Sequence, residues 1–148
     1  MNRLSAHIGY LFTERPLPDR LAAAAAAGFT AVEHPEPWAI PAAEMAARLG
    51  DLGLTFSQLG SGMGGNGGKG LAALPGREDG FRAGFRRALD HALAIGGPFV
   101  HPMAGVSGDV DPASARSVYR DNTAWALDLC AGTGVRPLVE AITIPGSA

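Results

Sequence analysis

Short apolar runs alternate with segments of helical periodicity along the whole chain, and this alternation limits the fold more than any other feature. The apolar runs predict five strands, at residues 4–10, 29–33, 54–59, 99–103 and 135–142. The segments between them predict four helices, at 19–27, 41–52, 78–95 and 111–131. Strands and helices in strict alternation form right-handed βαβ units around a parallel sheet. The sequence therefore predicts an α/β protein.

Local signals mark the ends of these helices. An alanine run ending at Ala27 favours helix, and Gly28 suits the position just after it. Asp111 followed by Pro112 is typical of an N-cap and a first helical turn. Within 78–95, apolar side chains recur every four residues, at Phe81, Phe85, Leu89 and Leu93. We therefore expect this helix to bury the face that carries them.

Length and charge narrow the class of protein. The chain has 148 residues, enough for one domain, 1–148, with a buried core. Its formal net charge of -2 gives no basic surface for nucleic acid or an anionic membrane. No apolar run approaches the roughly 20 residues that cross a bilayer, and no secretory signal is visible at the N-terminus. We expect a cytoplasmic protein without nucleic-acid or membrane partners.

Each predicted strand ends in a polar side chain. These side chains are His7, Glu33, Gln58, His101 and Glu140. The carboxyl ends of parallel strands lie on one face of an α/β protein, and active sites are built there. The alternative for any one of them is that it satisfies backbone groups at a strand end. Five in succession favour a site.

Glu140 is the most informative of the five, because a carboxylate without a partner after the apolar run 135–139 would be costly to bury. A metal ion, a basic partner or a role in proton transfer would explain it, and a structural salt bridge is the alternative. His101 and His7 are candidate ligands or acid/base groups, or else histidines with satisfied hydrogen bonds in the core.

Four further residues have plainer interpretations. His34 and Glu36 follow Glu33 and are expected in a solvated loop. His91 lies in a predicted helix and is expected at the surface. Cys130, the one cysteine, has no internal disulfide partner and is expected to be a small buried side chain.

A glycine-rich loop, residues 60–70, follows the third predicted strand. Residues 62–67 match G-x-G-x-x-G, but no helix opens there, so a dinucleotide site is not favoured. The segment Gly68-Lys69-Gly70 lacks the Ser or Thr that follows the lysine of a P-loop. We expect a mobile loop over the mouth of a pocket.

Several motifs together resemble the hydroxypyruvate isomerase family, a branch of the xylose-isomerase-like TIM barrels. They are Leu11-Phe12-Thr13-Glu14, Ala27-Gly28-Phe29 leading to Val32-Glu33, Ala73-Leu74-Pro75-Gly76-Arg77-Glu78, Val100-His101 with Met103-Ala104-Gly105-Val106, Asp121-Asn122, and Leu138-Val139-Glu140-Ala141. The block around His101 is most similar to the 2-oxo-tetronate isomerase branch. The resemblance implies a (β/α)8 barrel. A complete barrel needs roughly 250 residues, so we expect its N-terminal part only, stopping before the barrel closes.

The resemblance also implies an activity, the isomerisation of a short hydroxy-oxo acid such as hydroxypyruvate through an enediolate. The family uses two glutamates as proton donor and acceptor, often beside a divalent cation, Mg²⁺ or Mn²⁺. Glu140 matches the first glutamate and would also be a metal ligand, and the second belongs to later strands. His7, His101, Glu33 and Lys69 would bind substrate.

The glycine-rich loop departs from the family pattern. Gly62-Met63-Gly64 stands where the family has Gly-Asp-Trp, and Gly68-Lys69-Gly70 stands where it has Glu-Arg-Gly. The choice of substrate is therefore left open.

Two alternatives to an active isomerase remain. The chain is an inactive half-barrel, or it resembles the apurinic-site endonucleases, metal hydrolases of the same superfamily, although it lacks their basic footprint. For the half-barrel we expect unpaired strand edges and an apolar barrel-facing side. Such surfaces lead a chain to self-associate or to pair with a second copy.

Overall fold

The computed structural model describes residues 4–65, 68–106 and 108–141. In chain order the elements are β1 (Ser5–His7), α1 (Leu17–Ala26), β2 (Ala31–His34), the 3-10 helix η1 (Pro37–Ala39), α2 (Ala42–Asp51), β3 (Thr55–Gly60), α3 (Glu78–Ile95), β4 (Phe99–His101), α4 (Pro112–Cys130) and β5 (Arg136–Pro137). No helix in these three stretches combines the length and the apolar character needed to cross a membrane.

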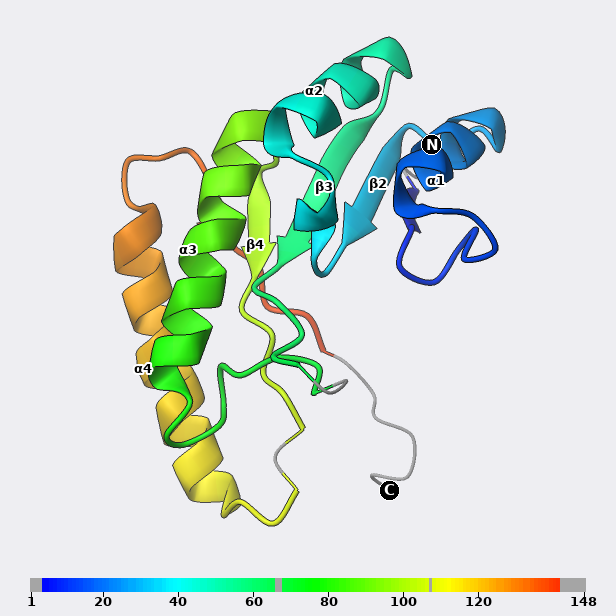
Figure 1. Ribbon diagram of the computed structural model, residues 1–148. Helices are drawn as coiled ribbons and strands as arrows, with labels where there is room; N and C mark the ends of the chain where they lie inside the picture. The colour runs from blue at the N-terminus through cyan, green and yellow to red at the C-terminus, as the bar shows by residue number, and fades with distance from the viewer. Residues whose placement is uncertain (1–3, 66–67, 107, 142–148) are drawn as a thin grey trace.

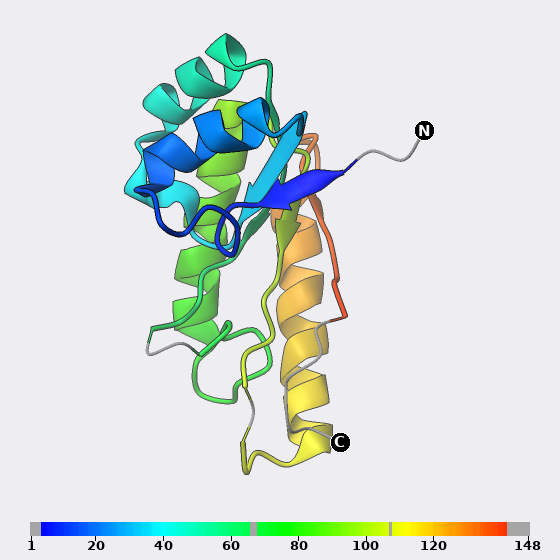
Figure 2. The same cartoon turned by 90° about the vertical axis from the view of Figure 1, so that its right-hand side faces the viewer.

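The five described strands form one parallel sheet in the order β1-β2-β3-β4-β5. Figure 1 shows α2 and α3 lying across β3 and β4, with α4 beside α3, and α3 contacts both α2 and α4. The view turned by 90° shows β1 at the edge of the sheet with α1 next to it (Figure 2). Strands that follow one another in chain order, each joined to the next by a helix, have the winding of a (β/α) barrel. The predicted partial barrel is confirmed.

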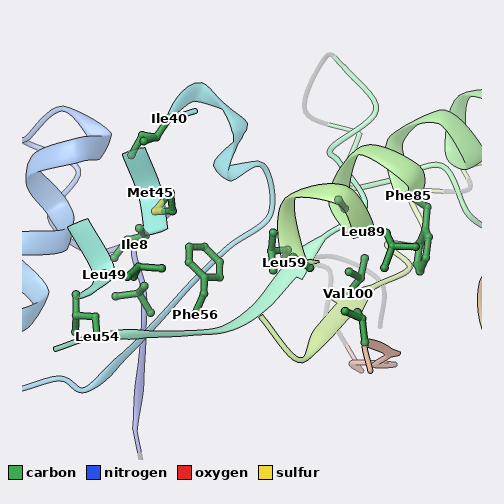
Figure 3. Packing of buried hydrophobic residues seen from close by; sticks show 14 of the residues in the cluster. Ile8, Ile40, Met45, Leu49, Leu54, Phe56, Leu59, Phe85, Leu89 and Val100 are labelled. Carbon is green, nitrogen blue, oxygen red and sulfur yellow. The ribbon is translucent and has the colours of Figure 1, made fainter. Parts of the chain in front are cut away.

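The core lies between the strands and the helices. Figure 3 shows Phe56 of β3 against Met45 and Leu49 of α2, and Val100 of β4 near Leu89 of α3. Each of these side chains is at most 6% exposed. Burying one large apolar side chain contributes about 1.5–3 kcal/mol, so this layer holds the helices on the sheet.

The other face of the sheet, which faces the inside of a barrel, is mostly polar. Strand alternation places Ser5, Glu33, Thr55 and Ser57 there, and Ser5 Oγ lies 2.7 Å from Ser57 Oγ. Leu4, Ala31 and Phe99 line a hollow at the amino end of the same face, so the expected apolar surface covers only part of it. Polar side chains on this face satisfy one another across strands, and β1 and β5 are the open edges in the part of the chain that is described.

The register between β2 and β3 changes within the pair. Val32 lies opposite Phe56, but Glu33 lies opposite Gln58, so Ser57 is an extra residue on β3. Such a β-bulge makes two consecutive residues face one residue of the neighbouring strand. Ser57 and Gln58 both contact Glu33 as a result.

Strand β5 is shorter than predicted. The expectation was 135–142, whereas the sheet contains only Arg136–Pro137, followed by a hydrogen bond from Leu138 N to Val100 O of 3.0 Å. Pro137 has no N–H to donate, which limits regular pairing. The last predicted residue, Ile142, lies outside the described residues.

Two side chains away from the strand ends test other expectations. His91 was expected at the surface but is only 7% exposed, so that expectation is wrong. Burial lowers its pKa. Cys130 is 5% exposed, as expected of a buried side chain, and burial raises the pKa of its thiol.

Candidate active site

A pocket of about 130 Å³ lies at the carboxyl ends of the strands. The five polar strand-end residues all line it, and so does Lys69. The rest of the lining consists of Tyr10, His34, Pro35, Gly60, Met63 and Met103. The structure thus brings every residue predicted to belong to the site, His7, Glu33, Lys69, His101 and Glu140, to one place.

Gln58 joins the two carboxylates of the pocket. Its Nε2 donates to Glu33 Oε2 at 3.2 Å and to Glu140 Oε2 at 3.4 Å. Ionised carboxylates only accept hydrogen bonds, so the amide nitrogen must face them and Oε1 must point elsewhere. Gln58 therefore holds Glu140 in position relative to β2 and β3.

Glu33 is itself fixed from below. Ser57 Oγ lies 3.3 Å from Glu33 Oε2 and 3.1 Å from Val32 O, and Ser5 Oγ contacts Ser57 Oγ. A chain of polar contacts thus runs from β1 through Ser57 and Glu33 to Gln58 and Glu140. Glu33 Oε2 accepts hydrogen bonds from both Ser57 and Gln58, so this oxygen has a structural role in holding the pocket residues in place.

His101 lies beside Glu140. Its Nδ1 is 3.8 Å from Glu140 Oε2, which is too long for a hydrogen bond. The side chain of His101 is 6% exposed and that of Glu140 is 50% exposed. Burial lowers the pKa of His101 below its ordinary 6.5, and the neighbouring carboxylate only partly opposes this. His101 is accordingly a neutral imidazole near pH 7, next to a carboxylate that solvent can reach.

Three buried polar atoms of the pocket residues have no hydrogen-bond partner among the described residues. They are His7 Nδ1, Gln58 Oε1 and His101 Nδ1. The ring of His7 stacks on Tyr10, with centroids 4.2 Å apart and planes 21° from parallel. Native proteins rarely leave buried polar groups unpaired, and such groups gathered around one pocket are typical of a site that binds a polar ligand.

His34 and Glu36 do not form the solvated loop that was expected. His34 lines the pocket, and its Nδ1 accepts the backbone N–H of Glu36 at 2.9 Å. Burial, with His7 and Arg20 nearby, lowers the pKa of His34 from 6.5 to about 4. Pro35 and Pro37 favour an extended or turn backbone after β2, but they do not indicate whether that turn folds over the sheet or extends into solvent.

Glu36 anchors the glycine-rich loop. Its Oε1 accepts the backbone N–H of Met63 at 2.6 Å. Further along, the described part of the loop is bound to the segment after β4, through hydrogen bonds from Gly105 N to Lys69 O and from Val106 N to Gly68 O, both of 3.1 Å. Residues 68–72 are thus hydrogen-bonded to 103–106, and the mobility of the loop remains a prediction.

The residues of the pocket do not form a metal site by themselves. Across the described stretches, no group of three His, Cys, Asp or Glu side chains is placed to hold a metal ion. His101 Nδ1 and Glu140 Oε2 are close enough to share an ion, but two ligands fall short of the usual set. The metal role expected for Glu140 remains a prediction.

A parallel sheet wound in chain order, with polar side chains gathered at its carboxyl end, defines the (β/α)-barrel class. The particular family follows from comparison with known sequences. The profile of the family described as xylose isomerase-like TIM barrel matches residues 21–148. This chain belongs to that family.

Individual relatives agree with the resemblance read from the sequence, which is confirmed. A 2-oxo-tetronate isomerase of Cupriavidus necator is 43% identical over 96% of this chain and 56% of its own length. A Caenorhabditis elegans protein provisionally named hydroxypyruvate isomerase is 34% identical over 98% of this chain and 58% of its own. This chain therefore spans about half the length of the curated relatives it matches.

Solved structures agree on the fold. The crystal structure of a protein of Brucella melitensis, titled AP endonuclease, family 2, superimposes with a TM-score of 0.87. It is 33% identical in sequence, and the match covers 96% of this chain and 56% of that one.

Proposed function

We propose that this chain forms the substrate pocket of an isomerase acting on a short hydroxy-oxo acid, hydroxypyruvate or a 2-oxo-tetronate. The observation that carries the proposal is the position of Glu140. It is held by Gln58 at the carboxyl end of the sheet, next to the buried neutral His101, and the rest of its side chain is open to the pocket. The names of the relatives support the same reaction class.

The proposed chemistry is a proton transfer between neighbouring carbons. The Glu140 carboxylate takes the proton from the hydroxyl-bearing carbon next to the carbonyl. The electron pair of the broken C–H bond forms a C=C bond, and the carbonyl π electrons move to its oxygen, which gives an enediolate. A proton then returns from Glu140 to the former carbonyl carbon. The hydroxyl on the first carbon gives up its proton and becomes the new carbonyl, and the former carbonyl oxygen takes up a proton and becomes a hydroxyl. His101, neutral and adjacent, supplies a hydrogen bond to an oxygen of the intermediate.

The test uses the complete gene product that contains this sequence. Hydroxypyruvate and 2-oxo-tetronate isomerisation are measured for the wild type and for Glu140→Gln, which keeps the shape of the side chain and removes its basicity. Loss of a positioned acid/base group costs roughly 10²–10⁴ in rate. Glu44→Gln, at an exposed carboxylate of α2 that forms an ion pair with Arg48, is the matched control and should keep full activity. An active Glu140→Gln protein would remove Glu140 from the mechanism.

An endonuclease is the second candidate, because the Brucella structure carries that title at 33% identity. One observation weighs against it: the net charge of -2 provides no basic footprint for DNA. Cleavage of DNA with an abasic site, measured on the same preparation, separates the two. Cleavage without isomerisation would favour the endonuclease.

Other expectations remain proposals. Residues 1–148 are proposed to be the N-terminal portion of one barrel domain in a cytoplasmic enzyme. Self-association and use of Mg²⁺ or Mn²⁺ are likewise predictions, and so is the inactivity of the 148-residue polypeptide by itself.

A further inference from the structure

The charges that line the pocket are unusual for a site proposed to bind an acid. Two carboxylates, Glu33 and Glu140, face it. His34 and His101 supply no positive charge near pH 7, because burial lowers the pKa of each. The two carboxylates repel an anionic substrate, so a positively charged side chain in the lining would favour its binding.

Lys69 is the one lysine or arginine among the described lining residues. It is also the single lysine in the entire sequence of 148 residues. Arg20 is close but is committed elsewhere, since it donates to Ile8 O and to Arg15 O, both at 2.8 Å. Among the residues described, no carboxylate lies within 4.0 Å of the Lys69 ammonium, so the charge is available to a ligand.

The backbone around Lys69 is built to hold it there. Lys69 has φ +53°, a left-handed conformation that residues other than glycine seldom adopt. Its carbonyl accepts Gly105 N at 3.1 Å, and Gly70 N donates to Met63 O at 3.0 Å. A Cβ on Gly70 would collide with the carbonyl of Met103. A strained residue fixed by its neighbours at a pocket is typical of a functional constraint.

We propose that Lys69 binds the carboxylate of the substrate and makes the pocket select acids over neutral sugars. The inference rests on the proposed function and adds an orientation to it. With the carboxylate at Lys69, the hydroxyl-bearing carbon is directed toward Glu140, where the proton is removed. The loop then sets the class of substrate, while the strand ends supply the chemistry.

The kinetic test compares an acid with its neutral analogue. Hydroxypyruvate and dihydroxyacetone differ by a carboxylate in place of a hydroxymethyl group. Lys69→Met should raise KM for hydroxypyruvate by about 10–100-fold, the range of a hydrogen bond to a charged group, and leave kcat/KM for dihydroxyacetone unchanged. Lys69→Arg should keep most of the preference for the acid. Arg116→Met, at an exposed position of α4, is the control and should change neither substrate.

A binding test does not depend on turnover. Reductive ¹³C-methylation of the complete gene product labels Lys69, whose NMR signal is identified by its loss in Lys69→Arg. Glycerate should shift this signal and glycerol should not. If the wild-type protein does not isomerise either acid but glycerate still shifts the Lys69 signal, the proposed function is wrong and the assignment of Lys69 as a carboxylate-binding residue is kept. The assignment would be overturned if glycerate did not shift the Lys69 signal. It would also be overturned if a folded Lys69→Met protein lost kcat/KM equally for hydroxypyruvate and for dihydroxyacetone.

Discussion

At the scale of single residues, the position of Glu140 depends on one amide. Gln58→Leu removes the donor that reaches Glu140 at 3.4 Å while keeping the bulk of the side chain. We expect kcat to fall by about 10–100-fold with little change in KM, since a hydrogen bond to a charged group is worth roughly 1.5–3 kcal/mol. Steady-state kinetics on the complete gene product measure both constants.

Ser57→Ala is the matched control for this change. It removes a contact to Glu33 from the same strand and leaves the contact to Glu140 intact, so its loss of kcat should be much smaller. Equal losses in Ser57→Ala and Gln58→Leu would mean that the polar chain, rather than the Gln58 amide, positions Glu140.

The strand-end rule identifies most of the pocket from the sequence alone. His7, Glu33, Gln58, His101 and Glu140 follow from it, because parallel strands end on one face. His34 and Glu36 do not, since a turn that folds back over a sheet leaves the same polar sequence as a turn that extends into solvent. The contacts of Glu36 with Met63 and of His34 with the pocket depend on the path of the backbone.

At the scale of elements, α3 shows which buried residues of a helix can be predicted from hydrophobic periodicity. Steps of four residues advance by about 40° more than a full turn, so a row of such steps drifts around the helix. Phe81 and Phe85 are buried as predicted, but Leu93, three steps of four residues after Phe81, is 48% exposed. His91 is buried instead, on a different flank, where it lines a hollow together with Ala42 of α2. Which flank a neighbouring helix covers is tertiary information that the pattern lacks.

The glycine-rich loop provides a prediction at the same scale. Gly70 and Gly65 both have positive φ, of +119° and +77°, but of these two only Gly70 is placed so that a Cβ would meet other atoms of the described residues. Gly65→Ala should cost about 1 kcal/mol of unfolding free energy for its backbone conformation alone. Gly70→Ala should cost roughly 1–3 kcal/mol more, because the segment 103–106 must move.

Thermal denaturation of the two variants measures this difference directly. The same preparations should show weaker binding of glycerate in Gly70→Ala, since the clash of the alanine Cβ with Met103 moves residue 70 and with it the adjoining Lys69. Equal melting temperatures would show that the loop is not held by its close approach to Met103.

At the scale of the whole molecule, three histidines with lowered pKa values couple stability to pH. Folding buries His34, His91 and His101 in their neutral forms. Below pH 6.5 these histidines bind protons in the unfolded state but stay neutral in the folded state. The free energy of unfolding should therefore fall as the pH falls from about 6.5 to about 4. For His34 the limit is about 3 kcal/mol, and its partial exposure to solvent lowers this figure.

Urea denaturation between pH 7.5 and pH 5 tests the coupling above the range in which carboxylates titrate. His34→Asn keeps an acceptor for the N–H of Glu36 and removes one titrating ring, so its stability should depend less steeply on pH than that of the wild type. A free energy of unfolding that stays constant over this range in the wild type would contradict the prediction.

The extra residue on β3 separates two demands that a strand usually has to meet at once. In a regular strand, successive side chains point to opposite faces of the sheet. Two consecutive side chains therefore cannot both face the pocket without moving the core residues that follow to the wrong face. Here Phe56 precedes the bulge and Leu59 follows it, and both remain buried in the helix layer. Ser57 and Gln58 lie between them, on the side of the pocket. Selection can therefore replace these two side chains, and with them the way the carboxylates of the pocket are positioned, while the packing that keeps the protein folded stays the same.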